Sequence, residues 1–224
     1  MAIQVQGNGG TIAEVDGTTF RALRVTGRPC DYGSLGYYRL GMVSGTVAAA
    51  LAANSEIFQF RWGDATRFAV PQLVVVSSGM NVAATAAGLA ALRMFLARSW
   101  SASGTGGTAA TMTGNNQKLR TSMGTSLVTD IRCASTAALG AGTKTIDSQD
   151  IGAIATGIGT GAITVSPTLP IFSPFPLFDV NASTDHPPVL AQNEGFGIRI
   201  GSAMPATMTW HFAVHCAWAE LASY

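Results

Sequence analysis

The residues best suited to chemistry are two histidines near the end of the chain, His211 and His215. Four residues is the spacing of a metal-binding pair on a helix, but the surrounding residues alternate between large apolar and smaller types. On a strand, such positions are about 13 Å apart at roughly 3.3 Å per residue. The two imidazoles therefore cannot share one ion without further ligands from neighbouring strands. The simpler interpretation places them on the solvent or subunit face, where a pH-sensitive contact is possible.

Other candidate sites lack the pattern that their chemistry needs. Asp185 and His186 could join a triad assembled in space, although the prolines that follow favour a turn before a strand. No GxSxG motif and no suggestive pair of carboxylates is present. The glycine-rich runs lack phosphate-loop spacing and favour turns. These runs are Gly7–Gly10, Gly104–Gly107 and Gly157–Gly161. The sequence therefore predicts no enzyme activity, no cofactor and no metal site.

The cysteines and tryptophans are interpreted as core residues. The cysteines are odd in number and widely spaced, with neither a CxxC pair nor zinc-finger spacing, so we expect buried thiols. They are Cys30, Cys133 and Cys216. The tryptophans fall at strand positions, which favours core packing over a platform for stacking sugars or bases. They are Trp62, Trp100, Trp210 and Trp218.

The segment Met208–Trp218 gives the clearest prediction of local structure. Large apolar residues occupy every second position, which is typical of a strand with one buried face. The buried side is predicted to hold Met208, Trp210, Phe212, Val214, Cys216 and Trp218, and the other side Thr209, His211, Ala213, His215 and Ala217. Phe196–Gly201 alternates as well, and Ser202–Ala206 supplies a break. The two segments are therefore predicted to form a terminal antiparallel hairpin.

Further strands are predicted upstream. Ile57–Trp62 and Phe68–Val76 are expected to be strands joined around residues 63–66, with Pro71 making the second an edge or bulged strand. The region Ala83–Trp100 also fits a helix face, but we favour a strand over Leu92–Trp100 because a loop follows it.

Composition places these strands in one main domain. The chain has 224 residues, a net charge of +1 and only 11% charged residues, against about 25% in typical soluble proteins. We predict an all-β, jelly-roll-like antiparallel sandwich with long loops over residues 46–224. Residues 1–45 are predicted to form an extended arm or the first strands.

The same composition narrows the expected partners. The chain has no apolar run long enough for a membrane-spanning helix and no basic stripe for nucleic acid, so neither partner is expected. The N-terminus lacks the features of a signal peptide, so we expect use without secretion. The low charge instead indicates a surface covered by other proteins.

Two groups of residues are the predicted contacts with such partners. A proline-punctuated segment between 167 and 178 is expected to be irregular and to pack its aromatic residues on something. Arginine greatly outnumbers lysine, which mildly supports a partner-facing surface, although genome composition explains it equally well. The residues chosen are Phe172, Phe175, Phe178, Arg21, Arg24 and Arg28.

A resemblance to a known group of proteins rests on three parts of the sequence. They are Ile57–Trp62, Gly106–Gly124, and Val189–Phe196 together with Thr209–Phe212. These segments resemble structural proteins of tailed-bacteriophage particles, and the similarity spans most of the chain. The group has no motif tied to a catalytic residue.

The resemblance implies a structural protein of the virion. First in order is a decoration, or cement, protein that binds and stabilises the capsid shell; a tail, neck or fibre component acting in host attachment is the alternative, and an enzyme is third. The implied partners are the major capsid protein and further copies of this chain, with a homotrimer expected. The implied location is the capsid surface, after synthesis in the host cytoplasm.

Overall fold

The chain divides into two compact units, Met1–Asp31 and Tyr32–Tyr224. The computed structural model describes residues 15–16, 22–23, 35–160, 170–182 and 187–222. In the first unit, β1 (Val15–Asp16) pairs antiparallel with β2 (Ala22–Leu23). The second unit is the sandwich, which begins with β3 (Gly36–Val43), ahead of the predicted boundary at residue 46.

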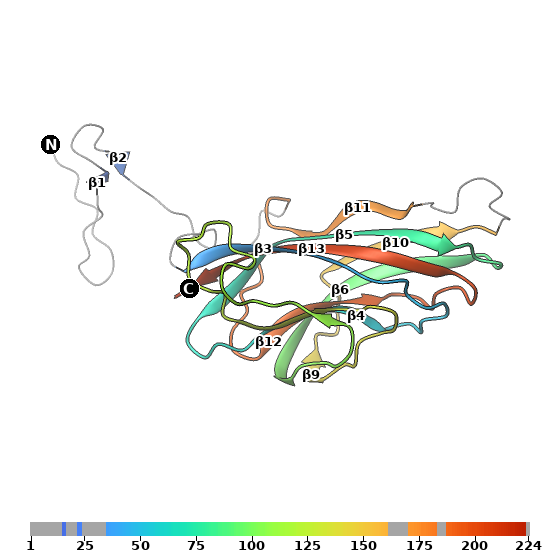
Figure 1. The fold of residues 1–224 in the computed structure, drawn as a ribbon, viewed down its shortest axis with the longest axis horizontal. Helices are drawn as coiled ribbons and strands as arrows, with labels where there is room; N and C mark the ends of the chain where they lie inside the picture. Colours follow the sequence, from blue (N-terminus) through green and yellow to red (C-terminus); the bar gives the residue numbers. More distant parts are fainter. Residues whose placement is uncertain (1–14, 17–21, 24–34, 161–169, 183–186, 223–224) are drawn as a thin grey trace. The chain divides into compact units, whose positions relative to one another are not determined.

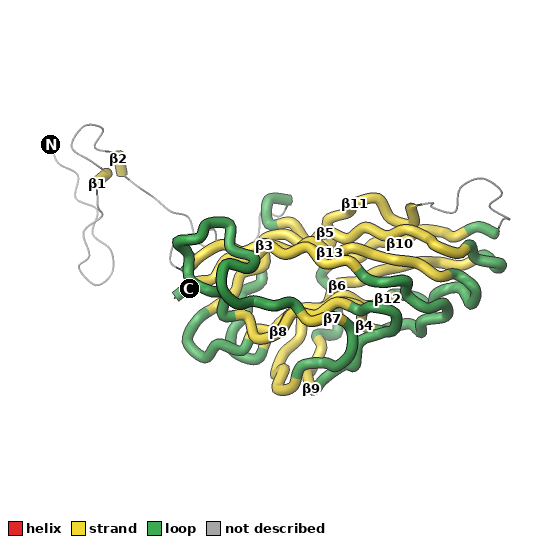
Figure 2. The backbone as a smooth tube through the Cα atoms, in the orientation of Figure 1, coloured by secondary structure: helices red, strands yellow, loops and turns green. Residues whose placement is uncertain are grey.

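The sandwich consists of two antiparallel sheets that lie face to face (Figures 1 and 2). We call the sheet with the strand order β11-β5-β13-β3 the front sheet. The other, called the back sheet, has the order β10-β6-β12-β4-β8-β7, with β9 also paired to β6. Besides β3, the front strands are β5 (Phe68–Val82), β11 (Pro170–Asp179) and β13 (Thr209–Leu221). The back strands are β4 (Glu56–Trp62), β6 (Gly88–Ala102), β7 (Thr108–Ala109), β8 (Val128–Cys133), β9 (Thr143–Ile146), β10 (Gly152–Ile158) and β12 (Glu194–Ile200). The described residues contain no helix, and so none that could cross a membrane.

The strand pairing is that of a jelly roll. Strand β6 pairs with β10 in the back sheet, β5 with β11 in the front sheet, β4 with β12 in the back sheet and β3 with β13 in the front sheet. Each pair thus encloses the previous one in the chain and lies in the opposite sheet, which is the nested topology of the jelly roll. The predicted all-β, jelly-roll-like sandwich is confirmed.

Alternation along β13 builds the core as predicted. All six residues assigned to its buried side are at most 1% exposed. Aromatic rings from both sheets meet there: Phe60 of the back sheet lies 5.2 Å from Trp218 and 4.8 Å from Phe196 between ring centroids. Because each such ring buries about 150–250 Å², these contacts hold the two sheets together.

The predicted terminal hairpin is wrong. Phe196–Gly201 corresponds to β12, which pairs with β4 and β6 in the back sheet, whereas β13 pairs with β3 and β5 in the front sheet. The chain between Ile200 and Thr209 therefore crosses from one sheet to the other. Alternation fixes which side of a strand is buried but not which strand lies beside it, and both strands point their apolar side into the same core.

Three other predicted segments are clarified by the sheets. The region Leu92–Trp100 lies within β6, so the strand prediction is confirmed and the helix alternative is excluded. Pro71 lies at a register shift between β5 and β13, so the prediction of a bulge is confirmed. The segment expected to be irregular contains β11, a strand whose pairing with β5 is interrupted by register shifts. Bulges let proline-rich sequence remain in a sheet.

Candidate interaction surface

The outward surface of the front sheet, called here the front face, is almost free of charge. In the sequences of its strands the charged residues are Arg39, Asp179 and Glu220. Glu220 is fully buried, and Asp179 stands at the end of β11. Arg39 is therefore the one charge within the outward surface of β3, β5 and β13. Depletion of charged residues at the centre of a surface is typical of an interface that partners cover.

Small residues form the middle of the front face. Ala213 of β13 lies between Val43 of β3 and Ser77 of β5 in the sheet register. Two residues further along β13, His215 lies between Gly41 of β3 and Val75 of β5 in the same way. Because cross-strand neighbours share a face, these side chains form a continuous surface with little relief.

A shallow depression of about 320 Å³ follows this small-residue surface. Its lining includes residues from all four strands, with Pro174 contributed by β11. One bulky apolar side chain stands in this lining, that of Val43 on the edge strand β3, which is 71% exposed. A hollow beside a raised apolar residue provides shape as well as apolar area for a partner.

The two histidines both belong to this face, but they have different partners. His215 Nε2 accepts a hydrogen bond from Arg39 Nε at 2.5 Å, and His211 Nδ1 lies 2.7 Å from Asn81 Oδ1. Burial, and then the charge of Arg39, lowers the pKa of His215. His215 is therefore neutral at pH 7. This supports the uncharged character of the front face.

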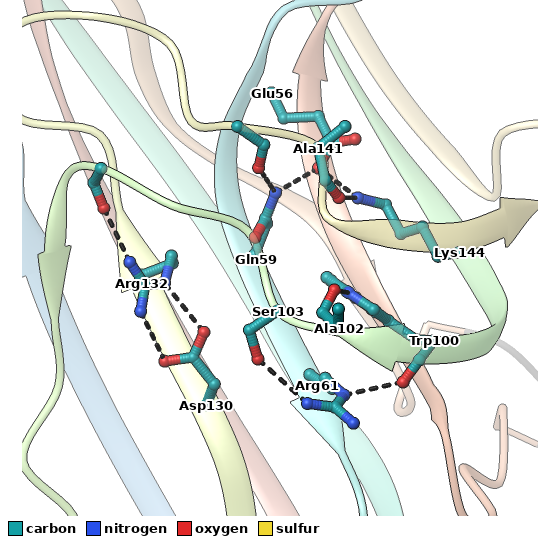
Figure 3. A network of polar contacts seen from close by, with 12 residues as sticks. Glu56, Gln59, Arg61, Trp100, Ala102, Ser103, Asp130, Arg132, Ala141 and Lys144 are labelled. Carbon is teal, nitrogen blue, oxygen red and sulfur yellow. Dashed lines mark hydrogen bonds and ion pairs between the residues drawn. The ribbon is translucent and has the colours of Figure 1, made fainter.

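The back sheet carries the charges that the front face lacks. Every ion pair between described residues involves its strands or the loop between β9 and β10, including Arg98 with Asp147 and Glu194. Arg132 bonds Asp130 within β8 and donates to Gly106 O (Figure 3). These charges face one another, so they fasten loops to the sheet rather than present a free charged surface.

The most deeply buried ion pair holds the segment between β6 and β10, called here the insertion, against the back sheet. Lys144 of β9 lies 2.8 Å from Glu56 of β4, with side chains 2% and 6% exposed. The amide nitrogen of Gln59 donates to the same carboxylate oxygen at 2.6 Å (Figure 3). The ammonium group also lies 4.5 Å from the ring centre of Trp100. Enclosed on all sides, this cluster has a structural role and no substrate access.

The predicted contact residues are distributed unevenly. Phe175 is exposed on β11, whereas Phe172 is only 3% exposed and belongs to the core rather than to the surface. Phe178 is half-buried and packs against the core. The remaining predicted residues with candidate roles lie outside the described residues. They are Arg21, Arg24, Arg28, Asp185, His186 and Cys30.

The other candidate residues take the structural roles expected of them. The four tryptophans are fully buried, which confirms core packing and excludes a stacking platform. Burial raises the pKa of Cys133 and of Cys216 to about 12, so both are buried protonated thiols. Gly106 and Gly107 have φ of 78° and 61°, values that suit a turn. Among the described residues, no His, Cys, Asp and Glu side chains cluster as a metal site would require.

Sequence reasoning missed Val43, Arg39 and the small-residue surface between them. Alternation in Gly36–Val43 could have identified Val43 as outward-facing, because Tyr38 and Leu40 on the other side are buried. The contact between Arg39 and His215 spans 176 positions and has no local pattern. Comparisons of the chain with family models, curated proteins and solved structures found no match.

Proposed function

We propose that this chain is a structural protein of a bacteriophage particle, which binds and stabilises the capsid shell as a decoration protein. The observation that carries the proposal is the uncharged front face, with its hollow of small residues beside the exposed Val43. The resemblance to virion proteins suggests the setting. The jelly roll, a fold used by capsid and lectin domains among others, is compatible with that setting.

The front face suits a partner that binds many copies at once. Four strands about 4.8 Å apart, over about eight residues of about 3.3 Å, give an area of roughly 500 Å². A standard interface uses about 800 Å² per partner, so one face alone gives modest affinity. Repetition over a shell, together with contacts outside this face, would strengthen attachment by raising the effective concentration of each further contact. The major capsid protein is the proposed partner, and copies of this chain would be neighbours on the shell.

The first experiment is the copy number of the chain in purified virions, measured by quantitative mass spectrometry against the major capsid protein. A number close to that of the capsid protein supports shell decoration. A few to a few dozen copies would instead place the chain in the neck, tail or fibre, the alternative function. Absence from the particle would overturn a virion role altogether.

A second experiment tests the front face itself. Ala213→Arg introduces a charge in the middle of the face and is expected to abolish binding to capsids that lack this protein. Ala109→Arg, on an exposed position of β7 in the back sheet, is the matched control and should bind like the wild type. Equal binding by both variants would show that the front face is not the contact.

A further inference from the structure

Most edge strands of the sandwich have features that prevent pairing with another chain. Strand β11 contains Pro174 and Pro176, which lack N–H donors, and its register is shifted. On β3, Arg39 N already donates to Gln117 O at 3.1 Å. The short strand β9 carries Lys144, and β7 has only two residues. Prolines, bulges, charges, coverage and short length are the usual means of protecting an edge.

Strand β10 is an edge strand without these sequence features, although its first residue, Gly152, lies against Leu177 of β11. Its seven residues, Gly152–Ile158, pair with β6 in unbroken register. It contains neither proline nor a charged residue, and no described strand pairs with its other side. In an antiparallel ladder, alternate residues direct their N–H and C=O groups away from the first partner. Strand β10 therefore presents a regular row of donors and acceptors.

The side chains of β10 allow close approach. Ala153, Ala155 and Gly157 are exposed, and they alternate with the more buried Ile154 and Thr156. At the two ends of the strand, Ile151 is 38% exposed and Leu89, opposite Gly157, is 48% exposed. Small residues along the strand with apolar residues at its ends would contribute buried area without steric hindrance.

We propose that β10 pairs antiparallel with β10 of a second copy of this chain, about a twofold axis, so that two back sheets become one continuous sheet. Self-pairing is favoured because the strand is uncharged throughout, so an identical strand brings no like-charge repulsion. An identical strand also has the same length, and a contact about a twofold axis gives a closed dimer. The inference goes beyond the proposed function and holds whether or not the chain is found in a virion. Because the contact is twofold, the expected trimer would need another surface.

The test is a charge exchange at the centre of the strand. Wild-type protein is expected to be dimeric by light scattering at high concentration and to dissociate on dilution. Ala155→Lys and Ala155→Glu should each be monomeric, since two like charges would meet across the axis. Mixing the two variants should restore the dimer through a Lys–Glu pair. Ala109→Lys and Ala109→Glu, exposed on β7, are controls that should leave the dimer intact.

Hydrogen exchange of the wild type provides a readout that needs no variant. Amides of β10 that point away from β6 should be protected in the dimer and exchange rapidly after dilution. A wild type that is monomeric at every concentration, or a dimer unaffected by either Ala155 variant, would overturn the proposal. Neither result bears on the copy number per virion, so the proposed function is judged separately.

Discussion

At the scale of single residues, Glu220 shows how a buried carboxyl can anchor a loop. It is fully buried on β13, where Oε1 accepts bonds from Ser126 Oγ at 2.5 Å and from Trp218 Nε1 at 3.1 Å. The N–H of Leu127 donates to the same carboxyl group. Burial outweighs these bonds, so the pKa of Glu220 is raised from its ordinary value of 4.5.

This raised pKa predicts a pH dependence of stability. The folded protein holds the Glu220 proton to higher pH than the unfolded chain, so the contribution of this group to the free energy of unfolding falls as pH rises from 4.5 through the raised pKa. Glu220→Gln keeps an acceptor oxygen but cannot ionise. Its stability relative to the wild type should therefore increase with pH across this range, as measured by urea unfolding at several pH values.

Glu220→Ala is the informative companion variant. It removes the acceptor and leaves buried donors unpaired, which costs about 1–3 kcal/mol, so it should be less stable than Glu220→Gln. If Glu220→Gln instead lost stability relative to the wild type as the pH rose, the raised pKa would be refuted.

The enclosed pair of Lys144 and Glu56 predicts a larger effect than the exposed pairs. Lys144→Met leaves the buried Glu56 carboxylate without its cation, which should cost about 3–5 kcal/mol. Arg98→Met removes a cation whose side chain is 39% exposed, and exposed pairs contribute only about 0–1 kcal/mol. Chemical unfolding of both variants measures the difference, and equal losses would contradict it.

Residue-scale predictions succeeded where the information was local. The burial of the tryptophans followed from their strand positions, and that of Cys133 and Cys216 from cysteine spacing that fits neither a CxxC pair nor a zinc finger. Lys144 and Glu56, by contrast, are 88 positions apart, and their meeting depends on the insertion folding back over the sheet. No spacing rule relates such residues, so the ion pair could not be read from the sequence.

At the scale of elements, local information again predicted which segments are strands but not which strands pair with each other. The loop after Trp100 favoured a strand for β6, and alternation identified β13 and its buried side, because these features depend on residues within one segment. It failed for β12 and β13, which are consecutive in the chain but belong to opposite sheets. A hairpin and a crossing between sheets both need a turn, so the turn residues alone did not distinguish them.

Two glycines near the ends of β10, Gly152 and Gly157, provide a matched test of local packing. A Cβ atom at Gly152 would lie 2.0 Å from Leu177 O of β11, whereas one at Gly157 would have no neighbour within 4 Å. Gly152→Ala should therefore cost about 1–3 kcal/mol through overpacking. Gly157→Ala should be neutral or should stabilise by up to about 1 kcal/mol, because alanine loses less backbone freedom on folding. Thermal unfolding compares them, and similar melting temperatures would contradict the close approach of β10 and β11.

At the scale of the sandwich, charge is divided between the two sheets. The back sheet carries the ion pairs of the described residues, and the front sheet presents Arg39 as the one charge within its outward surface. Low overall charge was visible in the sequence, but its division was not, because strands of the two sheets are interspersed along the chain. Only the jelly-roll pairing brings β3, β5 and β13 together into a surface with a single outward charge.

This division predicts how attachment to the shell should respond to salt. Attraction between charges is screened over about 8 Å at physiological ionic strength, whereas apolar burial is not weakened by added sodium chloride and is strengthened by sulfate. Binding to capsids through the front face should therefore persist in high salt, and Arg39→Gln should change the measured affinity little. Release by sodium chloride would contradict the front face as the main contact and direct attention to Arg21, Arg24 and Arg28. Replacement of those arginines by glutamine would then remove the salt dependence, while Ala213→Arg would leave binding unchanged, so that the two sets of contacts are distinguished on the same particles.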